Sequence, residues 1–156
     1  MYSPNKQIQH ITEINAPIEK VWKALIDIDD WKWNEWTRLE ASNVSEGLKG
    51  KLKASYNGDN KWETFDFTFG EVNPRTYILT WFGSVGPYGC MFSGYHTMRL
   101  EIIKDGQNVA SDKTRLIHTE KFGGLLPKLN LGLPYDKLEI NYLKMNESLK
   151  VFVEEK

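Results

Sequence analysis

The sequence predicts an α+β fold in which a curved antiparallel sheet wraps around one long amphipathic helix near the C-terminus. Three observations predict it. A strand-like segment and a short helix open the chain, alternating apolar residues then dominate residues 38–122, and an apolar stripe with helical spacing follows. Because no helical pattern separates the central strands, we expect about six of them to pair antiparallel with one another.

The chain is expected to begin with a strand over residues 8–14 and a helix that starts at Pro17. The even-numbered residues of the strand alternate with a more polar odd-numbered set. Proline suits the first helical position because the N–H that it lacks would have no partner there. The apolar residues that follow keep helical spacing, and Glu19 and Lys23 form a favourable i,i+4 pair. We expect this helix to end near Asp29-Asp30.

The middle of the chain is predicted to be mainly β. Asn57-Gly58-Asp59-Asn60 is typical of a hairpin turn, Asn73-Pro74 interrupts the chain, and Asp105-Gly106 turns it back on itself. The predicted strands are residues 51–56, 64–69, 77–82, 91–103 and 114–122.

A long helix is expected from Pro134 to about Glu154. Its apolar residues are spaced by four and three, so that they share one face. They are Leu138, Tyr142, Met145, Leu149 and Phe152. A sheet wrapped around this face encloses either a filled core or an apolar pocket, depending on side-chain bulk. The sequence leaves that choice open.

Length and composition limit the classes of protein. The 156 residues suit a single domain over residues 1–156, and 13% of them are aromatic. With a net charge of −1, the chain has no overall positive field that would attract nucleic acid, so no nucleic-acid partner is expected. Cys90 is the one cysteine of the chain, so neither an intramolecular disulfide nor a cysteine-based zinc site is expected.

The sequence also indicates a location. The first ten residues contain no apolar segment of the kind found in secretory signals, and the most apolar segment, Tyr77 to Phe82, is too short to span a bilayer. We therefore expect a cytoplasmic protein without stable membrane insertion, present as a monomer or weak homodimer.

Strand parity selects three polar residues for the inner face. On both long strands of the hairpin, the even-numbered residues are the apolar set and are expected to face the helix. This places His96, His118 and Glu120 among apolar neighbours. A hairpin centred near residue 108 sets His96 opposite Glu120 and Met98 opposite His118. A buried carboxylate needs a partner, and a histidine supplies one.

Three roles for these residues remain open. The first is a structural or ligand-orienting network. The second is acid–base catalysis, with a histidine as general base and Glu120 as the orienting group. The third is a site of two histidines and one carboxylate, a ligand set that suits iron or zinc. Because nothing in the spacing enforces a facial geometry, we expect no metal.

Trp31, Trp33 and Trp36 lie within six residues. Helical spacing places Trp33 and Trp36 on one face and Trp31 elsewhere. The run is expected to form an aromatic rim of a cavity, a short helix anchored on the sheet, or both. Stacking on single-stranded nucleic acid would require a basic groove that is missing.

Residues 83–89 are expected to form a flexible hairpin tip able to gate an opening, and Cys90 is expected to be a small apolar residue at the mouth of the cavity.

Segments along the whole chain resemble one superfamily in their order and spacing. They are residues 16–22 with Asp27 and the tryptophan run, residues 79–81, 92–96 and 114–127, and residues 145–150. They resemble the START-like helix-grip superfamily (SRPBCC), which includes polyketide cyclase/dehydrase and lipid-transport proteins. The resemblance implies a seven-stranded antiparallel sheet that grips a C-terminal helix, two short helices after the first strand, and a deep cavity for a hydrophobic ligand without a required cofactor.

The leading functional prediction is binding of a small hydrophobic ligand, lipid-like or aromatic and polyketide-like, between the sheet and the helix. The expected ligand-binding residues are Trp36, Phe67, Trp81, Phe92, His96, Met98, His118, Glu120, Phe122, Tyr142 and Met145. The alternative is a cyclase- or dehydratase-type enzyme that removes a proton next to a carbonyl, with His96, His118 and Glu120 as candidate catalytic residues. A protein-interaction domain would need an exposed apolar patch, which the polar outer faces do not favour.

Overall fold

Seven strands and four helical segments follow one another in the part of the chain that the computed structural model describes, which is residues 7–85, 91–104, 106–107, 112–128 and 135–155. In chain order they are β1 (Gln7–Ile14), α1 (Ile18–Ile26), the 3₁₀ helix η1 (Ile28–Trp33), β2 (Thr37–Glu40), β3 (Lys49–Ala54), β4 (Glu63–Asn73), β5 (Ile78–Val85), β6 (Phe92–Ile103), β7 (Lys113–Gly123), α2 (Leu125–Lys128) and α3 (Tyr135–Glu154). This order confirms the predicted α+β fold, including the two short helices after the first strand.

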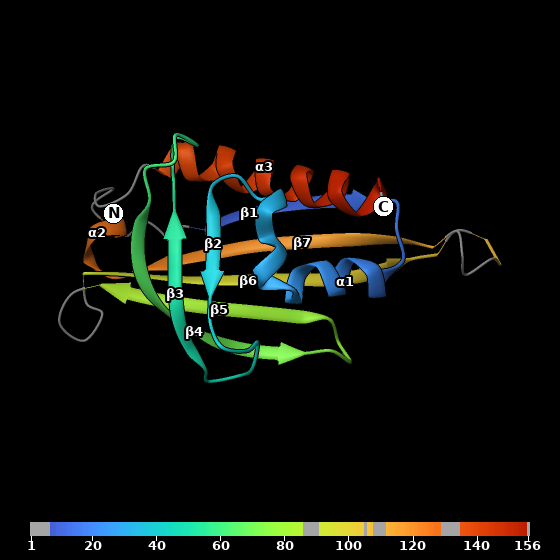
Figure 1. Ribbon diagram of the computed structural model, residues 1–156, viewed down its shortest axis with the longest axis horizontal. Coiled ribbons are helices and arrows are strands. Elements are labelled where there is room, and N and C mark those ends of the chain that lie inside the picture. The colour runs from blue at the N-terminus through green and yellow to red at the C-terminus, as the bar shows by residue number, and fades with distance from the viewer. Residues whose placement is uncertain (1–6, 86–90, 105, 108–111, 129–134, 156) are drawn as a thin grey trace.

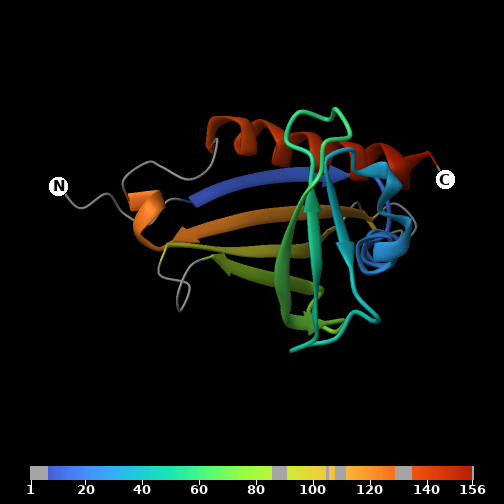
Figure 2. The same cartoon turned by 60° about the vertical axis from the view of Figure 1, so that its left-hand side comes forward.

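The strands form one antiparallel sheet in the order β1-β7-β6-β5-β4-β3-β2. The sheet curls strongly, since β2 and β3 run nearly crosswise to β6 and β7 in Figures 1 and 2. A register shift between Phe69 and Val72 interrupts the pairing of β4 with β5, and such bulges bend a strand. α3 lies along the sheet beside β1, while α1 and η1 cover the end at which the C-terminus lies (Figure 1).

The first helix is shorter than predicted. α1 ends at Ile26 because Asp27 leaves the helical conformation, with φ −82° and ψ 69°, and η1 takes over the residues around Asp29-Asp30. The indole N–H of Trp31 donates to the carbonyl of Leu25 at 3.0 Å. A side chain of η1 thus satisfies a carbonyl at the end of α1, where helical partners run out.

The predicted sharing of a face by Trp33 and Trp36 is wrong. Trp33 contacts Trp31, with ring centroids 5.5 Å apart. The chain leaves the helix at Asn34, whose backbone is extended, and Trp36 therefore points to a different region and packs on Tyr142 at 5.1 Å. The helix ends too early for the i,i+3 spacing to apply.

The predicted register of the long hairpin is confirmed. His96 lies opposite Glu120, and Met98 lies opposite His118. The expectation that every even-numbered residue of β6 faces the helix fails at Ile102, whose side chain is 45% exposed. Ile102 is the last residue but one of β6, at the end of the strand.

Among the described residues, the interior contains two apolar clusters. The first, which we call the closed end, lies beneath α1 and η1 and combines their side chains with those of the sheet and of the C-terminal half of α3. Its members include Trp22, Trp31, Phe69, Trp81, Met98, Met145 and Leu149. The second cluster, which we call the open end, lies beneath the N-terminal half of α3. Its buried members are Ile8, Trp36, Ala54, Phe122, Leu138 and Tyr142.

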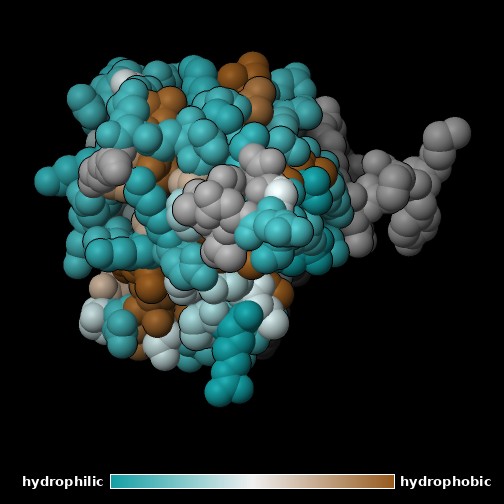
Figure 3. All heavy atoms as spheres, turned by 90° about the vertical axis from the view of Figure 1, so that its right-hand side faces the viewer, coloured by the Kyte–Doolittle hydropathy of each residue, from teal (hydrophilic) through white to brown (hydrophobic). Residues whose placement is uncertain are grey.

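The surface at the closed end is mainly hydrophilic, with separate small apolar patches (Figure 3). Among the described residues, no helix is long and apolar enough to cross a membrane. Two predictions cannot be placed: most of the expected gating tip, together with Cys90, and the helix start at Pro134 lie outside the described residues.

Candidate functional site

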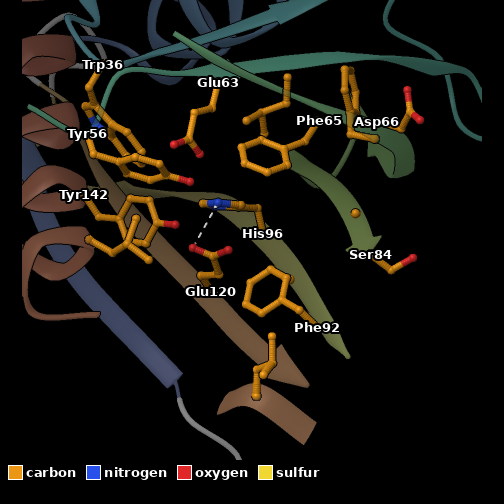
Figure 4. A pocket seen from close by; sticks show the side chains of 16 residues that line it. Trp36, Tyr56, Glu63, Phe65, Asp66, Ser84, Phe92, His96, Glu120 and Tyr142 are labelled. Carbon is orange, nitrogen blue, oxygen red and sulfur yellow. Dashed lines mark ion pairs between the residues drawn. The ribbon is translucent and has the colours of Figure 1, made fainter. Parts of the chain in front are cut away.

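The open end contains a cavity of about 250 Å³ between the curled sheet and α3. Strands β3 to β7 form its floor and walls, and α2 and the first half of α3 complete it. The lining residues are Trp36, Leu52, Tyr56, Glu63, Phe65, Asp66, Phe67, Gly83, Ser84, Phe92, Gly94, His96, Glu120, Leu126, Leu138 and Tyr142. Figure 4 shows aromatic rings around the space and a polar group at its centre.

The apolar walls follow from strand alternation. Phe65 and Phe67 lie two residues apart on β4 and so share the inner face. Phe92 and His96, four residues apart on β6, share it for the same reason. Leu138 and Tyr142 lie one helical turn apart on α3 and face the same space. Strands β4 and β6 of the inner sheet face and one face of α3 therefore converge on a mostly apolar cavity.

The polar end consists of Glu120 and His96. Glu120 is 5% exposed and His96 is 8% exposed. Glu120 Oε2 lies 3.1 Å from His96 Nε2, within ion-pair distance (Figure 4). The oxygen nevertheless accepts no hydrogen bond from the described residues, so it stands beside the imidazole without alignment to an N–H. A buried carboxylate oxygen without a hydrogen bond is costly and invites a donor.

A chain of hydrogen bonds leads from His96 into the core. His96 Nδ1 lies 3.2 Å from His118 Nε2, and His118 Nδ1 lies 2.8 Å from Asn146 Oδ1. Asn146 Nδ2 donates to Thr12 Oγ1 at 3.2 Å. The chain thus connects β6, β7, α3 and β1, and it fixes the orientation of His96 relative to the cavity.

The pKa of His118 is lowered to about 3, mainly by burial and also by the nearby His96 and His10. The hydrogen bond to Asn146 acts in the opposite direction. His118 is therefore neutral at physiological pH. Burial also raises the pKa of Tyr56, with the negative charges of Glu63 and Glu120 as further causes.

Packing holds the His96 ring in place. Trp81 stacks on it, with centroids 4.6 Å apart and planes 15° apart, and Tyr142 meets it edge-on at 5.0 Å. Gly94 gives the neighbouring carboxylate room, since a Cβ there would lie 2.8 Å from Glu120 Oε1. A larger residue at position 94 would displace that carboxylate.

Of the eleven residues expected to bind a ligand, six line the cavity: Trp36, Phe67, Phe92, His96, Glu120 and Tyr142. The other five lie behind its wall. Trp81 and His118 contact His96, Phe122 packs on Phe92, and Met98 and Met145 belong to the closed end. Whether any of the eleven binds a ligand remains a prediction.

Sequence reasoning missed several lining residues and one network residue. Phe65 and Glu63 share the parity of Phe67, so alternation alone was sufficient to find them. Asn146 is buried between Tyr142 and Leu149 on α3, and a polar residue within an apolar helical face is a detectable signal. Tyr56 has the parity of Leu52 in the predicted strand over residues 51–56, and it lines the cavity although β3 ends at Ala54.

In the described part of the chain, no group of three or more histidine, cysteine or acidic side chains is arranged to hold a metal ion. Both nitrogens of His118 already have partners, in His96 and Asn146. Glu120 and His96 are the buried polar pair of the cavity, whereas Glu63 and Asp66 line it as exposed residues.

The curled sheet around α3, with its two short helices, is the helix-grip fold that the resemblance implied. Solved structures with this fold include the ZhuI aromatase/cyclase from Streptomyces sp. R1128, with a TM-score of 0.70, 14% identity, and coverage of 97% of this chain and 94% of that one. Norcoclaurine synthase from Thalictrum flavum, in complex with dopamine and hydroxybenzaldehyde, has a TM-score of 0.67, 13% identity, and coverage of 97% and 88%. Hypothetical protein jhp0584 from Helicobacter pylori has a TM-score of 0.71, 14% identity, and coverage of 95% and 88%. No family model and no curated protein sequence matches the chain.

Proposed function

We propose that the protein binds a small hydrophobic ligand in the cavity at the open end, with the ligand's polar group at Glu120 and His96. The observation that carries this proposal is a mostly apolar cavity in which one buried carboxylate oxygen has no hydrogen bond from the described residues. Ligand pockets combine apolar walls with a few such polar groups, which orient the ligand.

The size of the cavity favours a compact ligand. An apolar cavity of roughly 150 Å³ is enough for benzene, and this one measures about 250 Å³. A compound of one or two rings therefore suits the space better than a whole lipid chain. The aromatic rings of Trp36, Phe65 and Phe92 offer surfaces against which such a ligand packs.

A second function is supported by the histidine–carboxylate pair. His96 and Glu120 are 3.1 Å apart inside the cavity, close enough to exchange a proton with each other and with a bound substrate. Two neighbours of the same fold are named as an aromatase/cyclase and a synthase. In this alternative, the protein is a cyclase- or dehydratase-type enzyme with His96 as general base and Glu120 as its orienting partner.

Binding of 2-naphthol, measured by calorimetry and by energy transfer from tryptophan, tests the proposed function. Leu138→Phe places a ring in the cavity and is expected to weaken binding at least about tenfold, whereas Leu143→Phe on the exposed face of the same helix is the matched control and leaves it unchanged. Equal affinity in both variants would place the ligand elsewhere and overturn the proposal.

Product analysis separates the two functions. Wild type and His96→Ala are incubated with polyketide-like aromatic ketones, and both binding and products are recorded. A general base contributes about 10²–10⁴ in rate. Turnover that collapses in His96→Ala while binding persists would establish the enzyme, and binding without turnover would support the binding protein.

A further inference from the structure

The hydrogen-bond chain behind His96 determines where its hydrogens lie. Because Asn146 Nδ2 donates to Thr12, its Oδ1 faces His118 and accepts from His118 Nδ1. The neutral His118 then has no hydrogen on Nε2. His96 Nδ1, 3.2 Å away, must donate to that nitrogen.

This assignment leaves two acceptor atoms near each other at the cavity. With its hydrogen on Nδ1, His96 presents an Nε2 without a hydrogen, and Glu120 Oε2, which accepts no hydrogen bond from the described residues, lies 3.1 Å away. A donor that reaches this pair from the cavity supplies the hydrogen bond that the buried carboxylate lacks.

The charges around the cavity narrow the choice of ligand further. Glu63, Asp66 and Glu120 line it, and no lysine or arginine is found among its described lining residues. Lys51 pairs with Asp66 but does not line the cavity. A carboxylate, phosphate or sulfate would therefore meet negative charge without a basic partner, whereas a hydroxyl or amino group meets acceptors.

We propose that the ligand is a one- or two-ring aromatic compound with a hydroxyl or amino group, whose O–H or N–H donates to the Glu120 carboxylate beside His96. This inference rests on the proposed binding function and names its ligand class. The ligand's O–H or N–H supplies the hydrogen bond that the carboxylate lacks, and its rings pack against the aromatic wall. The polar end thus selects donors over acceptors and anions.

Three naphthalenes of similar size test the selection by calorimetry: 2-naphthol, which donates a hydrogen bond, 2-methoxynaphthalene, which only accepts, and 2-naphthoate, an anion. We expect wild type to bind 2-naphthol at least about tenfold more tightly than either of the others. This ratio is measured on the unmodified protein, so it does not depend on whether any variant folds.

Two variants assign the selection to the pair. Glu120→Gln supplies its own N–H to His96, so the preference for 2-naphthol over 2-methoxynaphthalene is expected to fall to about twofold or less. Glu147→Gln removes one carboxylate charge from the exposed face of α3, outside the cavity lining, and it is the control that keeps the preference.

The outcomes are distinct. If all three probes bind in the cavity with equal affinity, or if Glu147→Gln and Glu120→Gln change the preference equally, the donor selection is wrong while the binding function stands. If no probe binds, both proposals are wrong. A preference in wild type that is lost only in Glu120→Gln supports the inference.

Discussion

The two ends of α3 differ in how the concave face of the sheet beneath them is filled. At the closed end, Leu149 and Met145 face a cluster filled by α1 and η1, and Trp31 is completely buried there. At the open end, Leu138 and Tyr142 on the same helix face the same sheet, but a cavity of about 250 Å³ remains. The difference comes from the two short helices, which reach one end of the concave face and not the other.

This difference teaches that a single helix can serve stability and binding in separate halves. The C-terminal half of α3 buries apolar side chains in a filled core, where removing atoms creates a void. The N-terminal half carries side chains that contact neighbours on one side and open space on the other. Changes in the first half are therefore expected to reduce stability, and changes in the second to alter binding.

The largest expected effect is on Leu149. Leu149→Ala is expected to lower the free energy of unfolding by about 2–5 kcal/mol, because the side chain is fully buried in the closed end. Leu138→Ala is the matched change on the same helix, and we expect it to cost about half as much, since one side of this leucine faces the cavity. Urea unfolding of both variants measures the difference, and equal losses would remove the distinction between the two ends.

A second effect concerns His118, which lies between the two ends. Its folded pKa of about 3 is below the unfolded value of 6.5, so the unfolded state binds more protons between these limits. The stability that depends on a neutral His118 is complete above about pH 6.5 and falls as pH decreases toward 3, by up to about 1.4 kcal/mol per pH unit.

The test compares the pH dependence of unfolding in wild type and His118→Gln. We expect the stability of wild type to fall more steeply than that of the variant as the pH drops below about 6.5. Parallel curves would mean that His118 is not held neutral by the fold.

A smaller effect is expected at Gly94. In Gly94→Ala the new Cβ meets the tip of the Glu120 side chain, which moves at little cost to stability. The displaced carboxylate then fits a ligand donor less well, so binding of 2-naphthol is expected to weaken severalfold while that of 2-methoxynaphthalene is unchanged. Calorimetry with both probes measures this, and an equal loss for both would indicate general crowding of the cavity instead.

The smallest effect is expected from chelation. Treatment with EDTA followed by gel filtration should leave the affinity for 2-naphthol unchanged, because both nitrogens of His118 are engaged within the protein. Elemental analysis before and after treatment accompanies the titration. Stoichiometric zinc or iron, lost together with binding, would contradict this expectation.

Much of the fold was predictable because it depends on periodicity. Alternation on β6 and β7, together with a hairpin centre near residue 108, was enough to place His96 opposite Glu120. The spacing of Leu138, Tyr142 and Leu149 was enough to give α3 its inner face. These patterns are local consequences of strand and helix geometry.

The site was only partly predictable because it depends on which elements meet. Strand parity identifies Trp81 and Met98 as inward-facing, but it does not tell the closed end from the open end. Trp36 reaches the cavity because η1 ends at Trp33 and the backbone is extended at Asn34. An early helix end is a tertiary outcome that helical periodicity does not predict.

The most direct test of the account is a crystal structure of the protein with 2-naphthol. We predict that the naphthalene rings lie in the open-end cavity against Phe92 and Tyr142, and that the hydroxyl oxygen lies within about 2.6–3.2 Å of the Glu120 carboxylate, beside His96. Rings bound outside the cavity, or a hydroxyl that points away from the pair, would contradict it.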